Sequence, residues 1–182
     1  LPYPSNPTGA IMEREDLEAL AKVLEGTNIM VLSDEIYAEL TFSGKAHVSP
    51  ASLPELYDRT ITVNGFSKAF SMTGWRLGFA CGPKEIMSQL LKIHQYAIMC
   101  APTTSQYAAI EALRNCDEDV EHMHKEYNMR RRIMVSGFNK IGLTCREPKG
   151  AFYAFPSIKS TGMTSEEFCE KLIYSKKVAV VP

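Results

Sequence analysis

The sequence has no long apolar run and almost no net charge. No stretch of eighteen apolar residues occurs among its 182 residues, and 20 basic residues nearly balance 21 acidic ones, so the net charge is −1. These features argue against a membrane-spanning helix and against a nucleic-acid-binding surface. With 45% hydrophobic and 23% charged residues, the composition is that of an ordinary globular protein. The basic run Arg130–Arg132 falls in a helical stretch and is interpreted as a solvated helix face.

Signatures of disulfides and metal sites are also missing. The five cysteines, an odd number without Cys-x-x-Cys spacing, are Cys81, Cys100, Cys116, Cys145 and Cys169. They are interpreted as reduced thiols of a cytoplasmic protein. His122 and His124 lie two apart on an expected helix and face different directions, while His47 and His94 have no partner at ligand spacing. No metal site is therefore expected.

The hydrophobic pattern predicts strands alternating with helices. Leucine and alanine recur at helical spacing over residues 17–24, and strands are predicted at 29–33, 60–63 and 77–81. Further helices are predicted at 83–98, 104–113 and 117–141, followed by a strand at 151–155, a helix with a Thr164–Glu167 capping box, and a strand at 178–181. The prediction is an α/β fold with functional loops at the carboxyl ends of the strands.

One lysine lies between two predicted strands, in the segment GFSKAFSMTGWRLG at residues 65–78. Lys68 falls in a small-residue loop at a strand end, and Arg76 follows eight residues later. Partial desolvation and a nearby cation both favour the neutral amine, which can form a Schiff base. The residues alone leave open a solvated lysine in a flexible turn.

Two other segments contain polar residues at turns. Asn6 lies in PSNPTG at residues 4–9, where Asn-Pro and Thr-Gly indicate a turn. Asp34 and Tyr37 follow the apolar strand in IMVLSDEIY at residues 29–37. On its own, an aspartate at a strand end is typical of a turn former or a helix cap.

Together these segments resemble the class I/II aminotransferases that depend on pyridoxal phosphate (PLP), within the aspartate-aminotransferase-like group. The matching positions of the lysine segment are Gly65, Ser67, Lys68, Gly74, Arg76 and Gly78. The resemblance implies that Lys68 forms the Schiff base with PLP and that Arg76 binds its phosphate through its planar fork. Some family members have a serine at the position of Gly65, and its hydroxyl contacts the phosphate. This chain lacks that hydroxyl, and Ser67 carries the nearest one.

The resemblance also assigns roles to three other side chains. The Asp34 carboxylate would keep the pyridine nitrogen protonated, which makes the ring an electron sink. Tyr37 and Asn6 would donate hydrogen bonds to the phenolic oxygen of the ring. Lys68, once released by the substrate amine, would act as the general base that moves the proton from the substrate.

The resemblance further predicts the domain organisation. Residues 1–118 would form part of a three-layer α/β/α large domain, with the 77–81 strand antiparallel in an otherwise mostly parallel sheet. Residues 119–182 would form part of an α+β small domain, entered through the long helix at about 117–141. Family members extend beyond both ends of this chain, so we expect it to be a fragment. The phosphate-binding turn, the aromatic residue stacked on the ring and the arginine for the substrate carboxylate would lie outside it.

Three functions are compatible with these motifs. The first is an aminotransferase that moves an amino group between an amino acid and a 2-oxo acid, with a homodimer or other self-association expected. The second is a carbon–sulfur β-lyase on the same fold, which would use the same residues. The third is a non-catalytic aminotransferase-like domain. Product analysis separates the first two, and the isolated chain is expected to be inactive.

Overall fold

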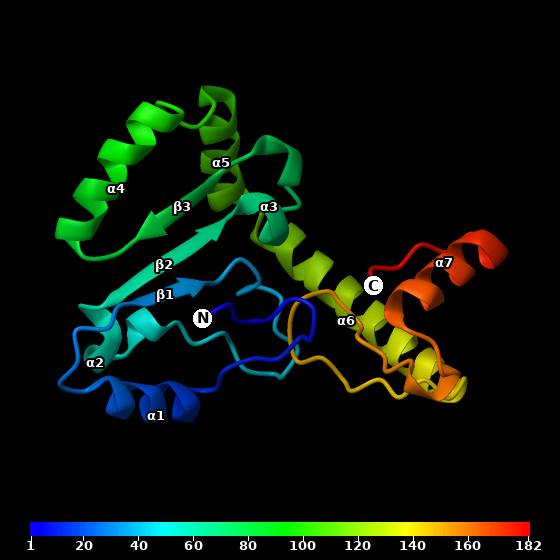
Figure 1. Cartoon of the computed structure of the whole chain (residues 1–182). Helices are drawn as coiled ribbons and strands as arrows, with labels where there is room; N and C mark the ends of the chain where they lie inside the picture. The colour runs from blue at the N-terminus through cyan, green and yellow to red at the C-terminus, as the bar shows by residue number, and fades with distance from the viewer.

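The computed structural model describes all residues, 1–182, and is built around a small mixed sheet. Strands β1 (Val31–Asp34), β2 (Thr60–Gly65) and β3 (Gly78–Cys81) lie side by side in that order. β1 is parallel to β2, and β3 is antiparallel to β2, as predicted (Figure 1). The β-branched side chains of β2 favour the extended backbone of this central strand.

Helices α1 (Arg14–Leu24) and α2 (Pro54–Tyr57) cover one face of the sheet, with a 3₁₀ turn, η1 (Pro50–Ser52), before α2. Leucines of these helices and of the residue before α2 form the largest apolar core with β1: Leu17, Leu24, Val31, Leu53 and Leu56. Leu56 is fully buried, whereas Leu32, which points to the other face of β1, is 58% exposed. Within this chain the sheet is therefore buried mainly on the α1 and α2 side.

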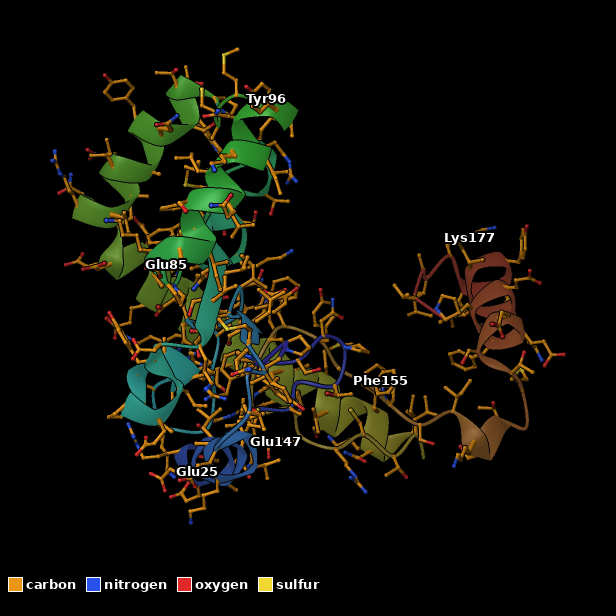
Figure 2. All side chains as sticks on the ribbon, turned by 60° about the vertical axis from the view of Figure 1, so that its left-hand side comes forward. Glu25, Glu85, Tyr96, Glu147, Phe155 and Lys177 are labelled. Carbon is orange, nitrogen blue, oxygen red and sulfur yellow. The ribbon has the colours of Figure 1, made fainter.

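A second group of elements follows β2. It comprises α3 (Phe66–Ala69), η2 (Thr73–Trp75), α4 (Lys84–Ala97) and α5 (Thr103–Asn115). An apolar cluster of Phe66, Met72, Ala109 and Ala112 joins these elements, so α5 packs against the α3 segment. α4 has no buried residue, and Tyr96 near its end is 88% exposed (Figure 2).

The chain ends in a long helix and a short one. α6 (Asp117–Lys140) is followed by Gly142 at a φ of +83°, and η3 (Lys159–Thr161) precedes α7 (Ser165–Lys176). The predicted capping box is confirmed, because the Glu167 N–H donates to Thr164 Oγ1 at 3.3 Å and the Thr164 N–H donates to Glu167 Oε2 at 2.9 Å. α7 stands apart from the elements around the sheet (Figure 2). No helix combines the length and the apolar character needed to cross a bilayer.

Two predicted strands are wrong. Residues 151–155 and 178–181 form no strand, and residues 141–182 take part only in two isolated bridges, Cys145 with Pro156 and Gly150 with Thr41. A strand needs a hydrogen-bonded neighbour, and these apolar segments have no ladder partner within the chain. Residues 141–182 are therefore helical and irregular.

The interpretation of Arg130–Arg132 as a solvated face is also wrong for its middle residue. The Arg131 side chain is only 9% exposed and pairs with Glu147 at 2.8 Å. Its Nη1 also donates to the Pro148 carbonyl at 2.8 Å, and its guanidinium lies 5.1 Å from the Phe42 ring centroid. Arg131 thus connects α6 to the loops that contain Phe42 and Pro148.

Candidate active site

Most of the predicted functional residues meet at one edge of the sheet. Asp34 ends β1, and Lys68 follows the end of β2 by three residues. Because β1 and β2 are parallel, their carboxyl ends lie at the same edge. Arg76 comes two residues before β3, which starts at this edge because it pairs antiparallel with β2 through Gly65 and Gly78 (Figure 1).

Lys68 lies on the short helix α3 rather than in a loop. The helix starts directly after β2 because Gly65 ends the strand and the buried Phe66 donates its N–H to the Leu77 carbonyl at 3.3 Å. The half-buried Lys68 side chain places Nζ 5.7 Å from the Tyr37 ring centroid and 5.4 Å from the Phe152 ring centroid. The amine thus faces two aromatic rings.

Tyr37 lies in an aromatic cluster beside Lys68. Its side chain is 5% exposed, and its hydroxyl lies 2.7 Å from the Tyr153 hydroxyl. Phe152 packs edge-on against its ring at 5.2 Å. Burial, the hydrogen bond with Tyr153 and the nearby charge of Asp34 raise the pKa of Tyr37 above its ordinary value. Tyr37 therefore stays protonated and remains a hydrogen-bond donor.

Asp34 is exposed at the end of β1. It points to the open face of the sheet, where Leu32 and Val63 are 58% and 37% exposed. Its Oδ1 accepts a hydrogen bond from the Ile36 N–H at 3.2 Å, while Oδ2 has no partner. The carboxylate is free to accept a hydrogen bond from another group.

Ser67 lies on α3, and Arg76 lies in the segment between α3 and β3. Arg76 is exposed at a left-handed φ of +54°, and its Nη1 donates to the Thr73 carbonyl at 2.8 Å. Thr73 in turn donates its hydroxyl to the Ser67 carbonyl at 2.9 Å. These bonds hold the guanidinium close to the turn that carries Lys68.

Gly65 has a steric reason to lack a side chain here. A Cβ at this position would lie 2.9 Å from Gly78 Cα and 2.9 Å from the Leu77 carbonyl oxygen. Such contacts would force the backbone of β3 to move. The close approach of β3 therefore disfavours any side chain at position 65.

Asn6 lies in the N-terminal segment, whose first two residues run beside β1. The Asp34 N–H donates to the Leu1 carbonyl at 2.9 Å, and Pro2 forms an isolated bridge with Asp34. The Asn6 side chain is exposed and makes no hydrogen bond with Lys68 or Tyr37. The structure thus brings its segment to the site without joining Asn6 itself to the other groups.

Phe152 and Tyr153 are site residues that sequence reasoning missed. Their segment was interpreted as a strand, and the hydroxyl contact joins residues 116 positions apart. The spacing of residues within one segment cannot predict a contact between residues so far apart in the sequence. The small residues Gly150 and Ala151 before the aromatic pair are the one signal of a close approach, and Ala151 is 1% exposed.

This arrangement defines a class of protein: an α/β domain that presents a lysine, a carboxylate and a phenol at the carboxyl ends of its strands. The class I and II aminotransferase family model matches residues 1–182. The chain therefore belongs to the class I and II aminotransferase family, whose members depend on PLP.

Individual relatives agree with this assignment. The chain is 55% identical over 179 residues to YugH of Bacillus subtilis (strain 168), a provisionally assigned aminotransferase, with 98% of this chain and 46% of YugH covered. It is 47% identical to an aspartate aminotransferase of Pyrococcus abyssi, covering 98% of this chain and 46% of that protein. The crystal structure of an aromatic aminotransferase from Pyrococcus horikoshii OT3 superimposes with a TM-score of 0.95 at 45% identity, covering 100% of this chain and 49% of that one. The chain thus spans about half the length of the relatives it matches.

Proposed function

We propose that this chain is part of a longer PLP-dependent aminotransferase that moves an amino group between an amino acid and a 2-oxo acid. The observation that carries the proposal is the Lys68 amine facing the Tyr37 and Phe152 rings at the strand edge where Asp34 ends β1. Two of the relatives named above, an aspartate aminotransferase and an aromatic aminotransferase, support the reaction class.

The side chains at this edge fit PLP in their chemistry. A primary amine can react with the aldehyde of PLP, and a carboxylate with a free oxygen can pair with its pyridine nitrogen. A protonated phenol can donate to the ring hydroxyl, and a guanidinium can bind the phosphate. We assign these roles to Lys68, Asp34, Tyr37 and Arg76, with Asn6 and Ser67 as additional hydrogen-bonding residues. When bound, PLP would supply a carbonyl for amines and an electron-accepting ring.

The chain's own residues would then orient the cofactor, shield the lysine amine from water and move a proton. Lys68 Nζ would hold the cofactor and later accept the substrate proton as general base. The raised pKa of Tyr37 keeps its hydroxyl a donor at neutral pH. Phe152, whose ring lies near Lys68 Nζ, would limit the access of water to the amine.

We also propose the domain organisation of the longer protein. Residues 1–118 would belong to a three-layer α/β/α large domain with a mostly parallel sheet, and residues 119–182 to the small domain. The open face of the sheet beyond Leu32 and Val63 supports a further layer on that side. Exposed apolar residues on α4, including Leu91, Ile93 and Tyr96, support a homodimer or other self-association. The five free cysteines support a cytoplasmic location.

The proposal is tested on the full-length protein by trapping PLP on its lysine. The protein is incubated with PLP, reduced with borohydride, digested and mapped by mass spectrometry. Modification of Lys68 is expected, and it should disappear in Lys68→Ala but persist in the control Lys92→Ala, whose lysine is exposed on α4. Label on another lysine, or none at all, would contradict the assignment.

A second measurement separates the possible reactions. The full-length protein is assayed with aspartate or phenylalanine as amino donor and 2-oxoglutarate as acceptor. Formation of the matching 2-oxo acid and glutamate supports the aminotransferase. Release of ammonia and pyruvate from a sulfur-containing amino acid, without glutamate, would instead identify a carbon–sulfur β-lyase.

A further inference from the structure

A buried polar cluster lies behind the candidate site, around Glu35. This glutamate is 4% exposed, although it directly follows the exposed Asp34. Its Oε2 lies 3.0 Å from His47 Nε2, and its Oε1 accepts a hydrogen bond from the Ser49 hydroxyl at 2.7 Å. The Thr62 hydroxyl of β2 lies 3.5 Å from the same Oε1. One carboxylate therefore connects β1, β2 and the segment that leads into η1.

The carboxylate is held in its charged form. Burial raises the pKa of Glu35, but hydrogen bonds from His47, Ser49 and Ser33, together with the charge of His47, hold it below its ordinary value. No buried side-chain nitrogen or oxygen in the chain lacks a hydrogen-bond partner. A buried carboxylate that is fully satisfied in this way has a fixed orientation, because rotation would break several strong bonds.

The backbone of Glu35 starts the turn that carries Tyr37. Its N–H donates to the Val63 carbonyl at 2.9 Å, and its own carbonyl accepts from the Ala38 N–H at 2.9 Å. Successive residues of an extended chain point to opposite faces. Fixing the Glu35 side chain on the α1 and α2 side therefore directs Asp34 to the open face and sets the path of the turn toward Tyr37.

We propose that Glu35 is a positioning residue which, through His47 and Ser49, holds Asp34 and Tyr37 where they would contact the cofactor. This inference rests on the proposed function and deepens it. Glu35 itself faces away from Asp34 and does not touch Lys68. Its effect on the cofactor passes through the backbone of residues 34–37.

The test uses the full-length protein and Glu35→Gln. Glutamine keeps the size of the side chain and one acceptor oxygen, but it loses the charge and places an N–H₂ group toward His47 or Ser49. The matched control is Glu39→Gln, because Glu39 is exposed in the same turn and has no hydrogen-bond partner. Two quantities are measured: the Kd for PLP from cofactor fluorescence, and the midpoint pH of the absorbance change of bound PLP.

We expect Glu35→Gln to raise the Kd for PLP by about tenfold, because a buried group loses its matched partner and the site shifts with it. We also expect the absorbance midpoint to move by about half a pH unit or more, since that midpoint reports the placement of the groups around the ring. Glu39→Gln should change neither quantity. A purely structural role would lower the urea midpoint of Glu35→Gln but leave the Kd and the pH midpoint of the folded protein at wild-type values, and that result would overturn the inference.

A milder variant covers the case in which Glu35→Gln does not fold. His47→Gln keeps a side-chain N–H donor but removes the imidazole ring that contacts Glu35, so it should weaken PLP binding in the same direction by about threefold or more. Unchanged binding in folded His47→Gln would then refute the positioning role. Failure of wild-type protein to label at Lys68 would instead refute the proposed function, so the two failures are distinguishable.

Discussion

Removing the Tyr153 hydroxyl tests the aromatic part of the site with a minimal change. Tyr153→Phe keeps the ring, whose centroid lies 5.8 Å from that of Tyr37, and deletes the hydroxyl that lies 2.7 Å from the Tyr37 hydroxyl. A neutral hydrogen bond contributes about 0.5–1.5 kcal/mol, and a buried polar group left without a partner costs about 1–3 kcal/mol. Because Tyr37 is 5% exposed, we expect a loss of about 1–2 kcal/mol in the free energy of unfolding.

The measurement is urea unfolding of the full-length protein, with Tyr174→Phe as the control. Tyr174 lies on α7, is 78% exposed and uses its hydroxyl in no hydrogen bond, so its variant should match wild type. A second readout is the spectroscopic titration of tyrosine. The pKa of Tyr37 should fall toward its ordinary value in Tyr153→Phe, because the hydrogen bond and the charge of Tyr153 are two of the causes that raise it.

The pH dependence of the free energy of unfolding tests the same hydroxyl pair, and the direction of the change with pH can be predicted. A tyrosine whose pKa is raised by folding stabilises the folded state below the unfolded pKa of about 10, and that contribution is lost as the pH rises further. The stability difference between wild type and Tyr153→Phe should therefore shrink above pH ~10. A free energy of unfolding equal to that of Tyr174→Phe, within about 0.3 kcal/mol, would show that the hydroxyl pair does not contribute as reasoned here.

The remaining predictions concern the carboxylates, the close glycine pair and the isolated chain. Asp34→Ala in the full-length protein should lose most PLP affinity or turnover while remaining folded, and turnover within about tenfold of wild type would exclude the electron-sink role. Gly65→Ser should lower the free energy of unfolding by about 1–3 kcal/mol in urea, because its Cβ would approach Gly78 Cα to 2.9 Å. The stabilising contribution of the Glu35 charge should be lost as the pH falls below about 4.3, and acid unfolding of Glu35→Gln should show a shallower pH dependence. Residues 1–182 alone should show no transamination in coupled assays and should self-associate in light scattering, and a strictly monomeric mass would refute the second part.

Local patterns in the sequence predicted the parts of the fold that local forces decide. The β-branched residues of β2, the leucine spacing of α1 and the Thr164–Glu167 capping box each act over a few residues, and the structure confirms all three. The antiparallel β3 was also predicted, although from the family resemblance rather than from the residues. The roles of Lys68 and its neighbours remain predictions.

The errors arise where distant residues decide the outcome. The apolar segment 151–155 has strand-like residues, but no strand within the chain pairs with it, and Phe152 and Tyr153 pack against Tyr37 instead. Arg131 looks solvated in a basic run, yet its partners Phe42 and Pro148 come from loops that local spacing cannot identify. The exposure of Asp34 depends on which elements cover each face of the sheet, and the hydrophobic pattern of β1 alone cannot predict this.

The aromatic part of the site depends on contact between the first ten residues and residues 148–150. Gly9, at a φ of +68°, accepts hydrogen bonds at its carbonyl from the N–H groups of Lys149 and Gly150, both at 2.9 Å. A Cβ on Gly9 would lie 2.2 Å from Pro148 Cβ, and a Cβ on Gly150 would lie 2.6 Å from Pro4 Cβ. Only glycine at both positions permits this approach without moving the backbone.

That approach fixes where the aromatic pair lies. The segment that carries Asn6 is thereby packed against the residues that lead into Phe152 and Tyr153, and the Ala151 N–H donates to the Leu40 carbonyl at 2.9 Å. Leu40 ends the turn that contains Tyr37, since its N–H donates to the Tyr37 carbonyl at 2.9 Å. The aromatic surroundings of Lys68 are thus set by two glycines far from it in the sequence.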